Sequence, residues 1–178
     1  MTAHYAPSLT VNDCIEALGV FLTPFLAAGG VAQIAVRGQV NRVPMPIQGG
    51  VVLTELMTTG IGRPRTDWPM DSVQPEDQII TLSGPTRIDV QCDFYSEGAG
   101  DVCEAVRIAF DSSWAYEQFP PDVKPLYISE GRQGPLVSGE QQYVNRFTAD
   151  VAIQYNPVVI VDQQSALDAE VTTIEAFP

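Results

Sequence analysis

Apolar and polar residues alternate most clearly in the stretch 140–157. Apolar side chains occupy every second position and mostly polar ones stand between them: Phe147, Ala149, Val151, Ile153 and Tyr155 against Thr148, Asp150, Ala152 and Gln154. A period of two is that of a β-strand with one buried face. We therefore expect a strand over 143–156.

The stretch 87–95 has the same alternation. Its apolar positions are Ile88, Val90, Cys92 and Phe94, and its polar positions are Arg87, Asp89, Gln91 and Asp93. Strands with one apolar and one polar face indicate a sheet that is covered on one side only, usually antiparallel or mixed. If the two strands are neighbours, one polar patch collects Asp89, Gln91, Asp93, Asp150 and Gln154.

Helical spacing of apolar residues marks two further segments. The first begins at a cap on Thr10 or Asn12 and is expected to end near Leu26, with Pro24 kinking or stopping it. The second covers about 99–112, and its buried stripe includes Val102, Val106 and Phe110. We expect this stripe to pack on the apolar face of the strand at 143–156, because each of the two patterns has one apolar side to bury.

The rest of the chain divides into short strands and long connections. A hairpin is expected from a strand at 31–37, a turn at 39–50 and a strand at 51–59. Two stretches rich in proline, 62–85 and 118–139, read as irregular connections, and such long loops are usually functional or disordered. An apolar run at 158–161 follows Pro157, and 169–177 is a candidate last strand.

Together these elements predict an α+β fold. Its mixed, mainly antiparallel sheet carries two helices packed on one face, and long Pro-rich loops connect the elements. The length of 178 residues fits a single domain, with 1–9 and 163–178 as peripheral tails.

The charge of the chain is strongly acidic, with 22 acidic residues against 9 basic ones and a formal net charge of −13. Tight binding of nucleic acid needs a basic surface that displaces counterions, and none is visible. An anionic membrane would repel the chain as well. No targeting segment or apolar run of about 18 residues stands out, so no membrane partner is expected.

Residues for catalysis, cofactors or metals are scarce. The single histidine, His4, cannot form a catalytic triad or a zinc site alone. The cysteines Cys14, Cys92 and Cys103 are too widely spaced in the sequence to form a zinc site, which suggests that they are reduced core thiols of a cytosolic protein. Asp89 and Asp93 lie about 13 Å apart along a strand, too far for one paired-carboxylate centre. We expect no catalytic residue, no cofactor and no metal.

Several stretches together resemble one known family. They are Ile88–Tyr95, Trp114–Glu117, Pro125–Tyr127, Gly139–Tyr143, Arg146–Thr148 and Ala152–Asn156, in that order after a helix, a hairpin and a Pro-rich loop. In this order they resemble the neck and tail-terminator proteins of long-tailed bacteriophages, over roughly 10–156.

The resemblance implies a structural virion protein that is assembled in the host cytoplasm. Such proteins form a ring, usually of six copies, which ends the tail tube and joins it to the head–tail connector or a head-completion protein. DNA passes through the hole and no reaction is catalysed. The acidic balance of this chain is consistent with a conduit in which DNA must slide.

Two surfaces are candidates for these roles. The polar patch of Asp89, Gln91, Asp93, Asp150 and Gln154 is a candidate lining of the hole, with an ordinary solvated face as the competing interpretation. Arg63, Arg65 and Trp68 in the stretch 62–85 are candidate assembly residues, since Arg and Trp are enriched at interface hot spots. The alternatives in function are an adaptor ring on the connector side, and a soluble module that binds a small ligand or a small accessory enzyme, either of which would use a cleft between the sheet and the long loops.

Overall fold

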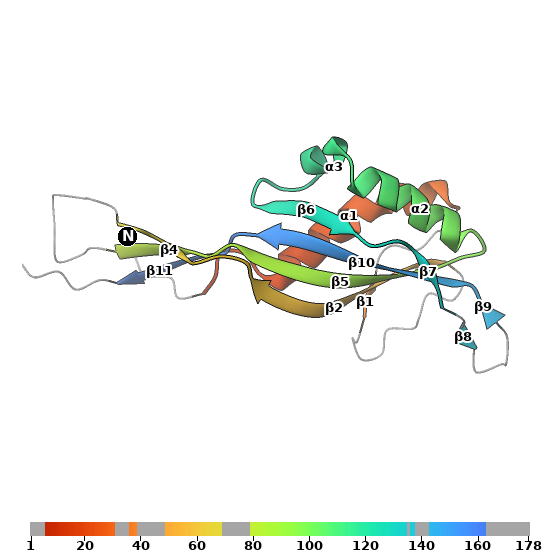
Figure 1. Ribbon diagram of the computed structural model, residues 1–178, viewed down its shortest axis with the longest axis horizontal. Helices are drawn as coiled ribbons and strands as arrows, with labels where there is room; N and C mark the ends of the chain where they lie inside the picture. The colour runs from red at the N-terminus through yellow and green to blue at the C-terminus, as the bar shows by residue number, and fades with distance from the viewer. Residues whose placement is uncertain are drawn as a thin grey trace, which may run out of the picture.

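A twisted sheet with helices on one face forms the body of the molecule (Figure 1). The computed structural model describes residues 6–30, 36–38, 49–68, 79–134, 136–137 and 143–162. The helices are α1 (Val11–Ala28), α2 (Ala99–Phe110) and α3 (Ser113–Gln118). The strands of the body are β1 (Val36–Arg37), β2 (Gly50–Gly60), β5 (Thr86–Tyr95), β6 (Val123–Ile128), β7 (Arg132–Gln133) and β10 (Arg146–Tyr155).

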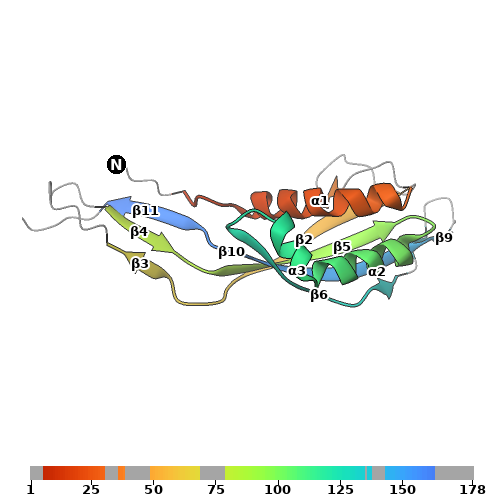
Figure 2. The same ribbon diagram turned by 90° about the horizontal axis from the view of Figure 1, so that it is seen from above.

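Two smaller sheets complete the described structure. The first is an arm that extends from one end of the body and consists of β3 (Arg65–Asp67), β4 (Ile79–Ser83) and β11 (Val158–Asp162), in the order β11-β4-β3 (Figure 2). The second is the pair β8 (Leu136–Val137) and β9 (Tyr143–Val144) at the opposite end (Figure 1). The α+β class predicted from the sequence is confirmed, with one short helix more than the two expected.

The body sheet has the order β1-β2-β5-β10-β6, and β7 also pairs with β10. The predicted strands at 87–95 and 143–156 are β5 and β10, and they are direct antiparallel neighbours along their full length, with Val151 opposite Val90 and Asp150 opposite Gln91. In an antiparallel pair, residues directly opposite each other share a face. The expected polar patch is therefore formed.

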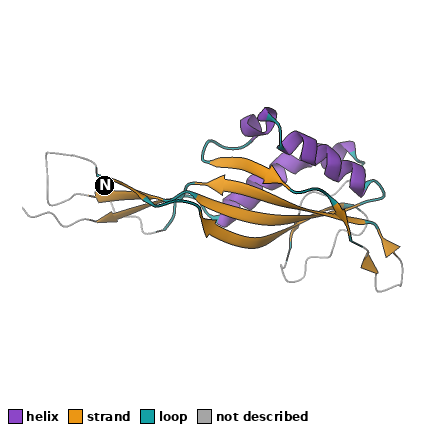
Figure 3. Cartoon of the chain, in the orientation of Figure 1, coloured by secondary structure: helices purple, strands orange, loops and turns teal. Residues whose placement is uncertain are grey.

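The helices cover the apolar face of this sheet, as Figure 3 shows. Val102, Val106 and Phe110 of α2 belong to one buried cluster with Val151 and Ile153 of β10, as the two patterns predicted. Helix α1 adds a buried side of its own, formed by Cys14, Ile15, Leu18, Phe21, Leu22 and Leu26. One core therefore joins both long helices to the central strands.

Helix α1 begins at a capping box and runs farther than expected. The Asp13 amide donates to Thr10 Oγ1 at 3.4 Å, and the Thr10 amide donates to Asp13 Oδ2 at 2.7 Å. Pro24 lies inside the helix, which continues to Ala28. By length and composition α1 could cross a membrane, but its buried side is part of the core of this fold. The cap of the helix is Gly29, where a Cβ would lie 2.6 Å from Val102 Cγ2 of α2.

The expected hairpin at 31–59 is wrong in its geometry. Strand β1 runs parallel to β2, with Val36 opposite Val52, whereas the two strands of a hairpin are antiparallel. Parallel neighbours need a crossover connection instead of a tight turn. Most of that connection, together with 31–35, lies outside the described residues, as does the candidate strand at 169–177.

The two Pro-rich stretches are also more regular than expected. The stretch 118–139 contains β6 and β7, which pair with β10, and β6 is an edge strand that accommodates Pro125 where its register shifts. The stretch 62–85 contains β3 and β4 of the arm, and 69–78 lie outside the described residues. The apolar run after Pro157 is β11, which pairs with β4.

Three strands of the body continue into the arm through a joint that we define as Ile61–Pro64, Gly84–Pro85 and Asn156–Pro157. Strands β2, β5 and β10 lie side by side in the body, and their continuations are β3, β4 and β11. Each crossing point contains a proline, which has no amide hydrogen for a ladder. The Ile61 amide donates to the Pro85 carbonyl at 3.0 Å and the Gly84 amide donates to the Pro157 carbonyl at 3.3 Å, which ties the three crossings together.

We predict that Val151→Asp lowers the free energy of unfolding by at least about 3 kcal/mol, because it buries a charge without a partner in the core. Ile108→Asp is the control, since Ile108 of α2 is 60% exposed and should change stability by less than about 0.5 kcal/mol. Urea denaturation of both variants measures the difference. A Val151→Asp protein with the stability of the wild type would contradict this core.

Candidate functional site

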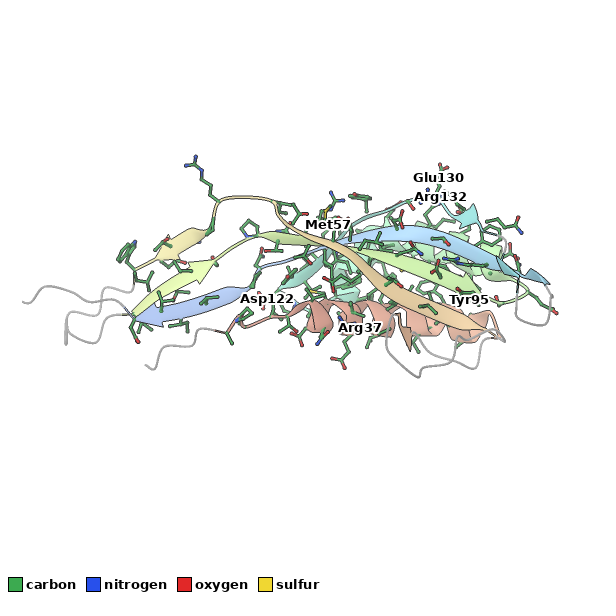
Figure 4. The ribbon with its side chains drawn as sticks, turned by 90° about the horizontal axis from the view of Figure 1, so that it is seen from below. Arg37, Met57, Tyr95, Asp122, Glu130 and Arg132 are labelled. Carbon is green, nitrogen blue, oxygen red and sulfur yellow. The ribbon has the colours of Figure 1, made fainter. Side chains whose placement is uncertain are left out.

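The face of the body sheet that carries no helix is polar, and Figure 4 looks onto it. All five residues of the predicted patch lie on this face. Asp150 stands opposite Gln91, Gln154 opposite Arg87, Asp93 opposite Thr148 and Asp89 opposite Ala152. The neighbouring strands extend the face with Met57 on β2 and Tyr127 on β6, opposite Asp89 and Ala152 respectively.

Asp93 is the best-connected carboxylate of this face and is only 5% exposed. Arg146 Nε and Nη2 donate to its Oδ1 at 3.1 and 2.8 Å, and Thr148 Oγ1 donates to the same oxygen at 2.7 Å. Gln91 Nε2 lies 2.9 Å from Oδ2 and donates to it. Burial alone would lower the pKa of Arg146, but the hydrogen bonds and charge of Asp93 outweigh burial and raise this pKa. The Arg146 guanidinium is therefore held in its charged form against this carboxylate.

Asp89 is paired with Arg87 two residues before it on β5. Arg87 Nε and Nη2 donate to Asp89 Oδ1 at 2.8 and 2.6 Å, and this hydrogen bond is the main cause that raises the pKa of the guanidinium. Arg87 Nη2 also donates to the Tyr127 hydroxyl at 2.5 Å, and the guanidinium carbon lies 5.1 Å from the centre of the Tyr127 ring. Hydrogen bonding and a cation–π contact thus hold Arg87 against the sheet.

Asp150 has a partner that the sequence reasoning missed. Arg132 Nη2 donates to Asp150 Oδ2 at 2.8 Å, from strand β7 within a stretch that the sequence alone presented as irregular. Figure 4 shows Arg132 and Glu130 at the rim of the helix-free face. Both side chains of the pair are more exposed than those of Asp93 and Arg146, at 69% for Arg132 and 36% for Asp150.

The electrostatic result is a face of paired charges. Each of its three aspartates has an arginine within hydrogen-bonding distance: Arg87 for Asp89, Arg146 for Asp93 and Arg132 for Asp150. The three carboxylates of the predicted polar patch are therefore neutralised locally. Gln91 and Gln154 add polar surface without adding charge.

The candidate assembly residues lie on the joint and the arm. Arg65 is on β3 and donates from Nε to Asp67 Oδ1 at 2.7 Å, and the adjoining Trp68 is 57% exposed. Arg63 lies in the joint, is exposed, and has no hydrogen bond or ion pair with any residue that the structure describes. The other arginines on the described strands and on α2 each have an acidic partner. Among the three candidates, Arg63 is therefore the arginine without an acidic partner in the described ranges, and Trp68 is the exposed aromatic side chain.

The described ranges contain no cluster of side chains that could bind a metal ion, since no group of three or more His, Cys, Asp or Glu side chains is placed to hold one there. The three cysteines are free and buried, and burial raises the pKa of Cys14 to about 12 and that of Cys103 to about 11. Their thiolates are therefore scarce at neutral pH, and the expectation of core thiols is confirmed.

A hollow of about 470 Å³ lies between α1 and the edge formed by β1 and β2. Its polar lining includes Asn12, Glu16 and Arg37. Arg37 already donates to the Asn12 side chain and lies 3.7 Å from Glu55, so its charge is partly used within the protein. The cleft that a ligand-binding module would need was expected between the sheet and the long loops, and this hollow lies elsewhere.

Comparison with known families gives one match that spans nearly the whole chain. The family model described as phage neck terminator protein matches residues 12–176. The comparison with curated proteins finds no match. The family match begins near the start of α1 and includes β5, β10, the joint and the arm.

We predict that Asp93→Ala lowers the free energy of unfolding by about 3 kcal/mol, because it leaves Arg146 partly buried without its counterion. Asp150→Ala is the matched control, and the exposure of its pair with Arg132 limits the loss to about 1 kcal/mol or less. Urea denaturation at low and high salt compares the two variants. Equal losses of unfolding free energy in the two variants would show that the buried pair stabilises the fold no more than the exposed pair does.

Proposed function

Since the chain belongs to the phage neck terminator family and is a structural protein of the virion neck, we propose that it forms a ring at the head–tail junction. In this proposal the ring terminates the tail tube and lets DNA pass through its hole. The observation that carries the proposal beyond the family is the helix-free sheet face, whose charges are paired.

The helix-free face is suited to lining the hole because it offers DNA little to bind. Non-specific DNA binding depends on basic side chains that replace the counterions of the phosphates. On this face Arg87, Arg132 and Arg146 are each held by an aspartate. Asp93 is too buried to meet DNA itself, so its role in the proposal is to hold Arg146 back from the phosphates.

The opposite face of the body has a different role in the proposal. It is occupied by the helices, whose inner sides are buried in the core. With helices outward and the sheet inward, the surfaces left for neighbouring parts are the ends of the body and the arm. These would contact the tail tube protein on one side and the head–tail connector or head-completion protein on the other. In the alternative, an adaptor ring on the connector side, the same ring binds the head–tail connector before it meets the tail tube.

We predict that the purified protein assembles into particles several times larger than 19.3 kDa, and that these particles bind the ends of isolated tail tubes. Light scattering coupled to gel filtration measures the mass, and negative-stain images locate the particles. Binding to tube ends supports the terminator. Binding to connectors with no binding to tubes would favour the adaptor, and a monomer that binds neither would contradict the ring.

We predict that the assembled wild type scarcely binds DNA and that lysines on the helix-free face change this. The variant combines Gln91→Lys, Asp150→Lys and Gln154→Lys, and it should bind DNA with an affinity that falls steeply as salt rises. The control combines Glu16→Lys and Glu117→Lys on the helix-bearing side, which changes the net charge by the same amount. Fluorescence anisotropy with short duplex DNA compares the assembled proteins. If both variants bind equally, or neither binds, this face does not line the hole.

A further inference from the structure

The arm has two edge strands, and the outer side of β11 is bonded at Val158 to Ser8 of the segment before α1. Strand β4 lies in its middle, with β3 on one edge and β11 on the other, and no strand among those described pairs with the outer side of either. Figure 2 shows the arm extending beyond the helices. An edge strand with unpaired backbone groups and apolar side chains is a site for pairing with another chain. Strand β11 is of this kind, with the sequence Val-Val-Ile-Val-Asp.

The backbone of β11 indicates which groups face outward. The Val158 amide donates to Ser8 Oγ at 3.0 Å, and its carbonyl accepts from the Ser8 amide at 2.9 Å, so both groups point away from β4. In an antiparallel ladder the direction alternates from residue to residue, so Ile160 also turns its amide and carbonyl outward. Neither group of Ile160 has an outer partner in the described part of the chain.

The same alternation can be followed across the arm to β3. Leu82 stands opposite both Val159 and Thr66. Since Val159 bonds to Leu82, the amide and carbonyl of Leu82 point towards β11. Neither group is then available to Thr66, which does not bond to β4. Thr66 therefore presents its amide and carbonyl at the outer edge of β3. Each edge of the arm thus offers one central donor and acceptor pair, from Thr66 and from Ile160.

The two edges are complementary in direction. Strands β3 and β11 are both antiparallel to β4 and are therefore parallel to each other. Copies related by rotation about a ring axis keep the same sense along that axis, so strands that run along the axis stay parallel from copy to copy. The β11 edge of one copy can consequently meet the β3 edge of the next as a parallel pair. Contacts between two different surfaces of this kind are the heterologous contacts that close rings.

The side chains of the edges are complementary as well. The β3 edge and the adjoining joint carry Arg65, Arg63 and the exposed Trp68. The β11 edge is apolar and ends at the exposed Asp162, and it belongs to a chain of net charge −13. Arg65 is paired with Asp67 on its own strand, so the Arg63 guanidinium and the Trp68 ring are the groups left to meet an apolar edge on an acidic body, a combination that favours a second copy of this chain as the partner.

We propose that β11 of one subunit pairs with β3 of a second copy, so that the arms join into one continuous sheet. This inference rests on the proposed ring and names the contact that closes it. The mode is strand addition, in which backbone hydrogen bonds supply affinity and the flanking side chains supply specificity. Arg63, which has no described partner within its own subunit, is placed at this contact.

Hydrogen exchange at single amides tests the pairing. The amides of Ile160 and Thr66 should exchange rapidly in protein diluted to monomers and slowly in the assembled particle. The amides of Val159 and Val161, which bond to β4, should be protected in both states and serve as internal controls. Protection of Ile160 and Thr66 already in the monomer would assign the edges to another segment of the same chain and overturn the proposal.

Other outcomes separate this inference from the function it rests on. A ring in which both amides remain unprotected overturns the arm contact and leaves the ring intact. Protection that appears only when tail tubes are added identifies the tube protein as the partner and also overturns it. A wild type that stays monomeric at all concentrations overturns both the ring and the arm contact.

Two variants test the arm contact independently, through the mass of the particles that they form. Ile160→Pro removes an outward amide hydrogen without removing a bond to β4, and Arg63→Glu with Trp68→Ser changes the side chains of the other edge. Each should weaken assembly at least about tenfold while the melting temperature of the monomer is kept. The control, Arg107→Glu with Ile108→Ser on α2, makes a comparable change away from the arm and should assemble like the wild type. Normal assembly of both arm variants would contradict the proposal.

Discussion

The antiparallel pairing of β5 with β10 is the interaction on which the rest of the structure depends. The ten residues of each strand are in register, so one set of alternate side chains enters the core and the other set forms the helix-free face. A slip of either strand by one residue would exchange its own two sets and place its aspartates under the helices, Asp89 and Asp93 for β5 or Asp150 for β10. The cost of burying unpaired carboxylates therefore fixes the register, and the register fixes both the core and the polar face.

This constraint extends to the arm. Because β2, β5 and β10 are neighbours, the strands that continue from them emerge as neighbours too, in the order β3, β4, β11. The prolines of the joint interrupt the ladder where the sheet passes from a part covered by helices to a part without them. All residues of β4 are half-buried, in contrast to the mostly buried apolar positions of β5 directly after the joint. The arm therefore depends on the body for its alignment and exposes more apolar surface.

Much of the body could be predicted from the sequence because its signals are long and periodic. The alternation in β5 and β10 and the stripe of α2 each extend over ten or more residues, and they identified the core and the side chains of the polar patch. The ion pairs of that patch could be foreseen only in part. Arg87 and Arg146 lie on the same strands as the aspartates, but Arg132 reaches Asp150 through a tertiary contact that leaves no local pattern.

The parts that were missed are short or interrupted. Strand β6 contains Pro125, and β3 has three residues, so neither shows a period that can be distinguished from a loop. Pairing with β10 and with β4 makes these segments strands, and pairing is decided by the fold as a whole. The parallel pairing of β1 with β2 was not predicted for the same reason, since the local sequence does not show which strands become neighbours.

The central claim is that copies of this chain surround a hole with their helix-free sheet faces turned inward. A cryo-electron microscopy reconstruction of the assembled protein tests it directly. The account predicts a closed ring with Arg87, Arg132 and Gln154 along the inner wall and with α1 and α2 outside. A ring whose hole is lined by the helices, or an assembly that does not close, would contradict it.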